Sequence, residues 1–243
     1  MKEQQPPTGG MWNLYKKGGI TPAISSMFGG QNAQQMAFIR SVMKEQRKTS
    51  LFDIPLKQLE FVVFDLETTG FFPTVDEIIS FGAVEMNGNQ IEYDKKYYSI
   101  VNPKRNISPE IEQLTGITNE MAQEAPDLID TLHGFFEFVH KRILIAHGTG
   151  HDKQFLDAAL RKTSKVSLSH RLLDTMMIGK WLHPHWPEHS LDALLEHYNI
   201  PVTVRHHALE DALMTAELWA RMLDDIYEKQ VVTLGDLYAY LST

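Results

Sequence analysis

An apolar run that ends on two acids constrains this chain more than any other feature. Phe61-Val62-Val63-Phe64 is rich in aromatic and β-branched residues and predicts a buried central β-strand. The run leads directly into Asp65-Leu66-Glu67-Thr68-Thr69-Gly70. Because alternate residues of a strand face the same side, Asp65 and Glu67 project together, with Leu66 buried opposite them.

Two carboxylates at the end of a buried strand repel each other and are costly to desolvate. A divalent cation such as Mg²⁺ or Mn²⁺ removes that cost, and it prefers oxygen ligands. A lone D-x-E is more often a pair of solvated acids. Here the Thr68-Thr69-Gly70 that follows favours a metal site, because it supplies hydroxyls and a flexible backbone beside the acids.

The pattern downstream predicts strands that are first paired and then alternate with helices. The Asn87-Gly88-Asn89 turn predicts a hairpin between its flanking strands. This order favours an α/β fold, with a mixed central β-sheet flanked by helices. The further strands are expected over 78–85, 91–101 and 142–146, and the helices from Ser108-Pro109, over 127–140, over 152–161, from Ser190 to Tyr198 and over 208–228.

The N-terminal residues have a different character. Residues 1–32 are interrupted by prolines and paired glycines, which predicts an irregular arm. Met36, Ile39, Val42 and Met43 then recur at helical spacing and predict a short amphipathic helix. We therefore divide the chain into an arm with this helix (1–58), one domain (59–230) and a C-terminal tail (231–243).

The amino-acid composition excludes several kinds of scaffold and catalytic site. The 243 residues include no cysteine, which excludes a disulfide scaffold, a thiol nucleophile and a thiolate zinc site. No apolar run is long enough for a membrane span and no secretory signal is evident, so a cytoplasmic protein is expected.

The net charge is −8, but residues 1–60 carry eight Lys/Arg against four Asp/Glu. The acidic remainder is compatible with a phosphodiester substrate if divalent cations lie between carboxylates and phosphate.

Two later segments carry further candidate residues. Asp152 lies near the start of a predicted helix, after a strand and a glycine-containing loop. Asp211 lies one turn into the long helix from Ala208, and His206 precedes it by five residues in a loop. Histidine titrates near neutral pH and is suited to act as a general base. Taken singly, Asp152 is more often a helix-start acid, and the His206-His207 pair is more often polar surface.

In order and in combination, these motifs resemble the DnaQ-like, or DEDDh, 3′→5′ exonucleases, which include the proofreading epsilon subunit of the bacterial replicative polymerase. The resemblance covers roughly residues 60–228 and implies a ribonuclease H-like fold. The D-x-E-T-T-G motif is matched by residues 65–70. The second motif is matched by Ala146-His147, Asp152 and Phe155-Leu156, and H-x-A-x-x-D-A is matched by residues 206–212.

The resemblance implies a role for each motif residue. Asp65, Glu67 and Asp211 would hold one of two divalent metal ions, Mg²⁺ or Mn²⁺, with Asp65 also touching the second. Asp152 would support the second ion through water. His206 would deprotonate the attacking water.

The resemblance also implies the substrate. Thr68, Thr69, Gly70 and His147 would hold the 3′ end of a nucleic acid, expected to be single-stranded DNA, and the product would be a nucleoside 5′-monophosphate. A DNA polymerase partner is possible on the same grounds. Gly148 and His151 replace the asparagine and phenylalanine usual in the second motif, which leaves the substrate preference open.

Three alternatives stay open. The substrate could be short RNA or an RNA 3′ end, or the chain could be a non-catalytic module that binds nucleic acid or a partner. A zinc hydrolase fits less well, because no H-E-x-x-H occurs. Two roles are open for the basic N-terminal arm. It helps to retain the nucleic-acid strand or docks a partner; alternatively, its helix covers an apolar face of the domain.

Overall fold

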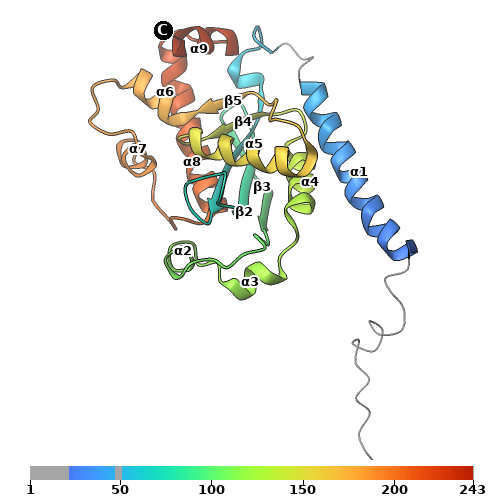
Figure 1. Ribbon diagram of the computed structural model, residues 1–243. Helices are drawn as coiled ribbons and strands as arrows, with labels where there is room; N and C mark the ends of the chain where they lie inside the picture. The colour runs from blue at the N-terminus through green and yellow to red at the C-terminus, as the bar shows by residue number, and fades with distance from the viewer. Residues whose placement is uncertain (1–21, 47–50, 243) are drawn as a thin grey trace, which may run out of the picture.

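A mixed five-stranded sheet forms the centre of the protein. The computed structural model describes residues 22–46 and 51–242 (Figure 1). The strand order is β3-β2-β1-β4-β5; β1 pairs antiparallel with β2 and parallel with β4, β2 pairs antiparallel with β3, and β4 pairs parallel with β5. The strands are β1 (Glu60–Thr68), β2 (Ile78–Asn87), β3 (Gln90–Ile100), β4 (Ile143–Ala146) and β5 (Leu172–Asp174). The predicted α/β class, the buried central strand and the hairpin are confirmed.

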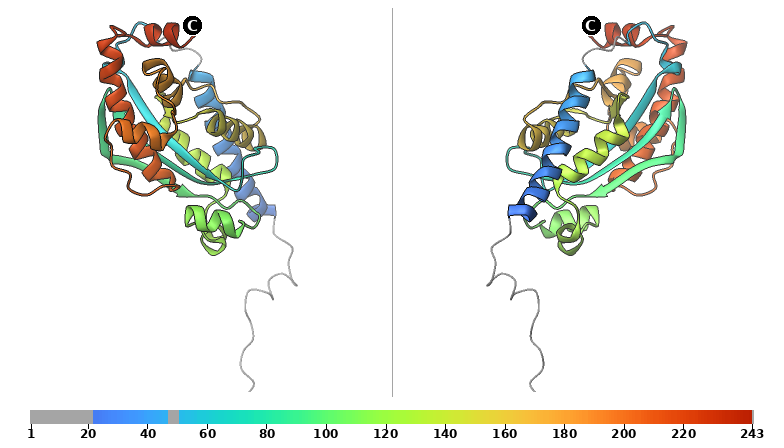
Figure 2. Two further views of the ribbon diagram at one scale, coloured as in Figure 1. Left: turned by 90° about the vertical axis from the view of Figure 1, so that its left-hand side faces the viewer. Right: turned by 90° about the vertical axis from the view of Figure 1, so that its right-hand side faces the viewer.

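Helices cover both faces of this sheet. α8 lies against one face, and α1 and α4 lie on the other (Figure 2). The helices are α1 (Pro22–Gln46), α2 (Pro109–Thr115), α3 (Asn119–Glu124), α4 (Leu128–Val139), α5 (Gly150–Ser164), α6 (Thr175–Leu182), α7 (Leu191–His197), α8 (Ala208–Glu228) and α9 (Leu234–Leu241), with a short 3-10 turn at Leu56–Gln58. None of the helices that the structure describes is long and apolar enough to cross a membrane.

The alternation of side chains along β1 separates two apolar cores. Phe61 and Val63 pack with α8 and with the helices beside it. Val62, Phe64 and Leu66 pack in the opposite core with α1, α4 and α5. Since Asp65 and Glu67 continue the first series, β1 presents them on the face that α8 covers.

A glycine allows α8 to begin very close to the sheet. Gly82 of β2 is the pairing partner of Asp65. A Cβ atom on Gly82 would lie 2.1 Å from the carbonyl carbon of Ala208 and 2.1 Å from the nitrogen of Leu209. These are backbone atoms at the start of α8, so no side-chain rotation would relieve the clash. The missing side chain therefore sets how closely α8 approaches Asp65.

We expect Gly82→Ala to displace the start of α8 and to lower the free energy of unfolding by about 1–3 kcal/mol or more. Gly30→Ala in α1 is the matched control, because a Cβ there meets nothing within 4 Å. An alanine inside a helix should stabilise the control by about 0.5–1 kcal/mol. Urea unfolding measures both variants. Equal stability of the Gly82→Ala and wild-type proteins would contradict the proposed close packing.

The expectation for the N-terminal residues is wrong over 22–32. α1 begins at Pro22 and continues through Gly29-Gly30, whereas an irregular arm was expected to residue 32. Proline is tolerated at the first position of a helix, and a glycine inside one costs only about 1 kcal/mol. Ile39, Val42 and Met43 are buried against α4 and α5, so the predicted apolar stripe holds the helix on the domain. Residues 1–21 of the expected arm lie outside the described residues.

Several short elements were not predicted from the sequence. β5, α3 and α6 were missed, and so was α9, which lies within the expected C-terminal tail. Leu234 and Leu237 of α9 are buried in the core beside α8, and Thr233 caps the helix in a capping box with Asp236. The division of the chain at residues 58 and 230 remains a prediction, although both flanking helices pack on the domain.

Candidate active site

Four carboxyl groups meet at the start of α8, and they come from three segments of the chain. Asp65 and Glu67 lie on β1, Asp152 lies in the first turn of α5, and Asp211 lies in the first turn of α8. Glu67, Asp152 and Asp211 are 8%, 4% and 4% exposed, and Asp65 is partly buried. Buried carboxylates need a compensating charge, so this arrangement requires either protons or cations.

The electrostatics show how strongly these groups influence one another. Burial raises the pKa of Asp65 well above its usual value, and the charges of Asp152, Glu67 and Asp211 raise it further. Burial likewise raises the pKa of Glu67 to about 8, with added contributions from Asp211 and Asp152. Burial raises the pKa of Asp152 to about 7, and burial also raises that of Asp211. Without a metal ion, the cluster therefore retains protons near neutral pH.

These shifts predict a pH dependence of the metal-free protein. A carboxyl group with a higher pKa in the folded chain stabilises the fold below its unfolded pKa, and this stabilisation is lost as the pH rises through the folded pKa. For Glu67 the window runs from about 4.5 to about 8. In EDTA, the melting temperature of the wild type should therefore fall more steeply across this window than that of Glu67→Gln. Parallel curves for the two proteins would contradict the assigned shift.

His206 adjoins the carboxyl cluster from the loop before α8. Its backbone N–H donates to the Asp211 carboxylate at 2.9 Å, and its backbone φ is +60°. Ligand atoms of Glu67, His206 and Asp211 all lie within 4.8 Å of one another. Asp65 and Asp152 are outside that group but are coupled to it through their charges. The side chain of His206 is exposed, so its ring has access to solvent.

Arg205 is a site residue that sequence reasoning missed. Its guanidinium forms an ion pair with Asp211 and another with Asp192 of α7, the latter with an N–O distance of 2.7 Å. The Arg205 charge lowers the pKa values of Asp65 and Glu67 and so partly offsets the repulsion among the acids. Its position beside His206 was the only sequence signal, because the pairing with Asp192 depends on how α7 packs.

His207 occupies a different environment from His206. Its ring stacks on Tyr98 of β3, with centroids 4.7 Å apart and an interplanar angle of 15°. Its Nδ1 atom is buried and has no hydrogen-bond partner among the described residues. His207 therefore packs against the sheet, whereas His206 faces the carboxyl cluster.

Hydrogen bonds from the hydroxyl groups of Thr68 and Thr69 hold the loop that follows Glu67 in place. The Thr68 hydroxyl donates to the Gly70 carbonyl at 2.7 Å and lies 3.4 Å from Nε2 of His151. The Thr69 hydroxyl donates to Asp76 at 3.1 Å. A Cβ on Gly70 would lie 2.5 Å from the Asp76 carboxylate, which would have to shift from its hydrogen bonds to Thr69 and Phe72 to make room.

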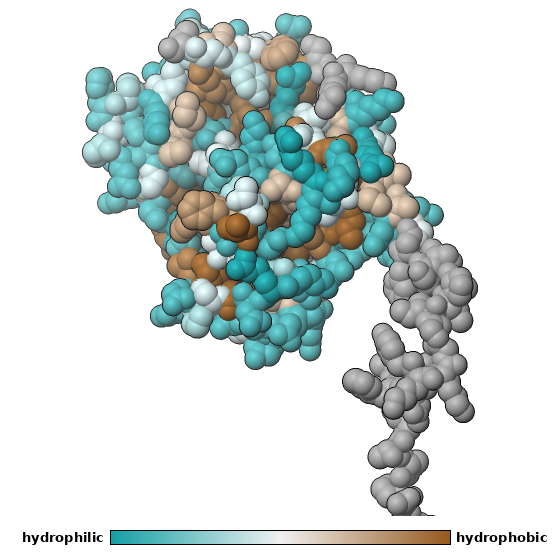
Figure 3. All heavy atoms as spheres, viewed as in Figure 1, coloured by the Kyte–Doolittle hydropathy of each residue, from teal (hydrophilic) through white to brown (hydrophobic). Residues whose placement is uncertain are grey.

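The loop that follows Gly70 exposes apolar side chains beside the site. Phe71, Phe72 and Val75 are 81%, 68% and 63% exposed. Apolar side chains gather in the middle of the otherwise largely hydrophilic face shown in Figure 3, in the region where Figure 1 places this loop. Exposed aromatic rings are a kind of surface on which flat ring systems, such as nucleic-acid bases, can stack.

The hydrogen-bond contact of the His147 ring is with Thr175 of α6 and not with one of the four acids. Its Nδ1 lies 2.9 Å from the Thr175 hydroxyl, and its Nε2 is buried without a partner among the described residues. Burial lowers the pKa of His147 to about 4, so the ring is neutral. The next residue, Gly148, has a φ of +68° and donates its N–H to Asp174 at 3.0 Å. A substrate contact of His147 remains a prediction.

The donor set indicates which metal ions the site could hold. It consists of carboxylate oxygens with one imidazole, and the chain has no cysteine. Oxygen-rich sets favour hard divalent cations such as Mg²⁺ and Mn²⁺ over ions that prefer thiolates. The raised pKa values of the acids agree with this, because a cation would take the place of the protons that the cluster otherwise binds.

Comparison with known proteins settles the family. Residues 62–219 match the RNase_T family model, which describes exonucleases. The chain belongs to this exonuclease family. The membership expected from the motifs is therefore confirmed.

The most similar curated relatives include much longer polymerases. The chain is 37% identical over 177 residues to the PolC-type DNA polymerase III of Bacillus subtilis, covering 72% of this chain and 12% of the relative. It is 30% identical over 226 residues to the PolC-type DNA polymerase III of Thermotoga maritima, covering 93% of this chain and 16% of the relative. The exonuclease chain thus spans less than one sixth of the length of these relatives.

Solved structures confirm the ribonuclease H-like fold. A structure titled as 3′-end specific recognition of histone mRNA stem-loop by 3′-exonuclease superposes with a TM-score of 0.61 and 22% identity, covering 73% of this chain and 84% of that chain. Escherichia coli exonuclease I in complex with a dT13 oligonucleotide superposes with a TM-score of 0.61 and 18% identity, covering 76% and 44%. Because both sequence identities are below 25%, these structures show only that the folds are similar.

Proposed function

We propose that this chain is a metal-dependent 3′→5′ exonuclease that releases nucleoside 5′-monophosphates from the 3′ end of a single DNA strand. The convergence of Asp65, Glu67, Asp152 and Asp211 from β1, α5 and α8 supports this most directly. Four carboxyl groups with raised pKa values form a site that divalent cations stabilise. The family membership supports the reaction class.

Two divalent ions bound to these acids would stabilise the attacking and leaving oxygens of an in-line displacement. Asp65, Glu67 and Asp211 would hold the first ion, and Asp65 and Asp152 would contribute to the second. His206 accepts the proton of the attacking water at a ring nitrogen. The hydrogen bond from its backbone N–H to Asp211 fixes the His206 loop relative to the metal ligands.

Thr68, Thr69, Gly70 and His147 are proposed to position the terminal nucleotide. Thr68 and Thr69 follow the metal-binding acids directly, and their hydroxyls order the loop that carries exposed Phe71. His147 would support the nucleotide-binding surface from the interior, because its ring contacts Thr175. We also propose a DNA polymerase as partner and a cytoplasmic location, since relatives of this chain are named as DNA polymerases.

RNA is the second candidate substrate. One structural neighbour is titled as an exonuclease that recognises the 3′ end of histone mRNA stem-loop, and another as bound to rAMP. Gly148 and His151 differ from the usual second motif, and His151 lies close to Thr68 in the region proposed to bind the nucleotide.

Hydrolysis of 5′-labelled single-stranded DNA and RNA of equal sequence, in Mg²⁺ and in Mn²⁺, tests the proposal. We expect stepwise shortening from the 3′ end with release of 5′-monophosphates, and faster cleavage of DNA. Asp65→Ala should be inactive, whereas Asp94→Ala, which removes an exposed acid from β3, should behave as the wild type. Binding of the strand without cleavage in either metal would instead favour a non-catalytic module.

A further inference from the structure

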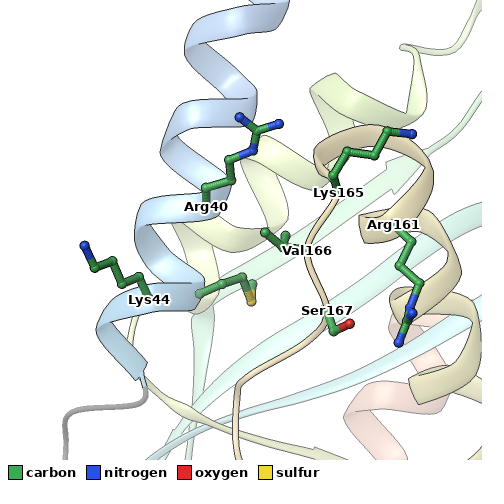
Figure 4. Close-up of a pocket in the computed structure, with 7 residues that line it drawn as sticks. Arg40, Lys44, Arg161, Lys165, Val166 and Ser167 are labelled. Carbon is green, nitrogen blue, oxygen red and sulfur yellow. The ribbon is translucent and has the colours of Figure 1, made fainter.

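An open, basic cavity lies between α1 and the C-terminal end of α5, and none of the four carboxyl groups lines it. The cavity measures about 590 Å³ and is lined by Arg40 and Lys44 from α1 and by Arg161 and Lys165 from the end of α5. Figure 4 shows the two pairs on opposite walls, with Val166 and Ser167 on the chain that leaves α5. No acidic residue is among the described residues that line it.

These four cations differ in their charge pairing from most other basic residues that the structure describes. None of them takes part in an ion pair with a carboxylate of the described residues. Most other lysines and arginines around the sheet do, including Lys141 with Glu45 of α1. Since residues 61–243 carry a large excess of acidic side chains, an unpaired basic cluster on this body is a local reversal of charge.

The walls of the cavity are fixed to each other. Nε of Arg40 donates to the Ser164 carbonyl at 2.8 Å, and the Ser169 hydroxyl donates to the Met43 carbonyl at 2.7 Å. Ile39 and Val42 of α1 are buried with Leu156 and Leu160 of α5. The basic side chains are therefore presented by a rigid pair of helices, and Lys44 and Arg161 carry charge that this packing does not require.

The helix that lines the cavity also carries a proposed metal-site residue. Asp152 lies in the first turn of α5 and Arg161 in its last turns. At 1.5 Å per residue, Arg161 and Lys165 lie about 14 and 20 Å along the helix from Asp152. A single strand of a few nucleotides is long enough to cover this distance.

We propose that this cavity binds the phosphodiester backbone of the nucleic-acid strand whose 3′ end lies at the four carboxylates. The proposal rests on the proposed function for the identity of the strand. Four basic side chains with no ion-pair partner among the described residues match a polyanion. Arg161 and Lys165, at the end of α5, are held by this helix at a constant distance from Asp152. Long strands gain these contacts, and a dinucleotide is too short to reach them.

A different explanation accounts for the same cations. Helix C-termini favour positive charge, and α1 and α5 both end beside the cavity. On that explanation, charge reversal would lower the melting temperature without affecting strand binding. An acidic protein segment is another occupant that would leave strand binding unchanged.

The test is the double variant Lys44→Glu/Arg161→Glu, which keeps the packing contacts of Arg40. Its matched control, Lys180→Glu/Arg221→Glu, makes the same change in net charge at exposed positions of α6 and α8, away from α1 (Figure 1). Affinity for a labelled DNA strand of about 20 nucleotides is measured in Ca²⁺ across a salt series, and kcat/KM is measured in Mg²⁺ on this strand and on a dinucleotide.

We expect the cavity variant to bind the long strand on the order of tenfold more weakly, and its log–log salt slope to become shallower by about 0.7 per lost contact. Its kcat/KM on the dinucleotide should match the wild type, and the control should match the wild type on both. Long-strand affinity equal to that of the control overturns the proposal, and so does an equal loss on both substrates. If wild-type protein cleaves neither substrate, the proposed function fails, and the Ca²⁺ binding series still decides the cavity.

Discussion

Replacing Asp65 with alanine is expected to reduce hydrolysis by at least about 10²–10³-fold, the scale seen when a group that stabilises charge at the reacting centre is removed. The metal-free variant should melt at the same temperature as the wild type or higher. The reason is that Asp65 is surrounded by Asp152, Glu67 and Asp211, whose charges oppose its ionisation. Glu67→Ala and Asp152→Ala should behave in the same way.

The Asp211→Ala variant should differ from the other three variants in its melting temperature. The Asp211 carboxylate forms an ion pair with Arg205 and accepts a hydrogen bond from the backbone N–H of His206. Removing this carboxylate leaves both donors without that partner. We expect inactivity together with a lower melting temperature. Mn²⁺ titration followed by calorimetry should show weakened metal binding for each of the four variants. Near-normal turnover in any of them would remove that residue from the proposed metal site.

The second large effect is expected at His206. His206→Ala should lower kcat by a factor on the order of 10²–10⁴, the usual contribution of a general base, and should flatten the acidic limb of the pH–rate profile. The melting temperature should change little, because the His206 side chain is exposed and its hydrogen bond to Asp211 comes from the backbone.

His207→Ala provides the comparison. It removes a ring that stacks on Tyr98, so stability should fall while the shape of the pH–rate profile is retained. A larger loss of kcat in His207→Ala than in His206→Ala, with loss of the acidic limb, would exchange the roles of the two residues.

The parts of the site that could be predicted from the sequence depend on local periodicity. The two-residue repeat of β1 placed Asp65 and Glu67 on one face, and Leu66 lies in the opposite core as expected. The spacing from His206 to Asp211 spans one loop and one helical turn, so it too is local. The long helix was predicted with the bounds observed, Ala208–Glu228.

The parts that were missed depend on packing between distant segments. The Arg205 pairing with Asp192 requires α7 to lie beside the loop before α8. β5 has only three residues, and its pairing with β4, not its own pattern, makes it a strand. α1 extends over Gly29-Gly30 against local propensity. For α9 a local signal was present, because Thr233 and Asp236 form a capping box.

The way α8 seats against Gly82 has a consequence for the newly made chain. During synthesis the N-terminal part of a protein leaves the ribosome first, and domains generally fold as units. Asp65 and Glu67 would emerge long before Asp211, and the proposed metal site would lack Asp211 until α8 docks on β2 beside Gly82. A nascent or truncated chain that lacks α8 would therefore hold an incomplete site, and we expect it to be inactive.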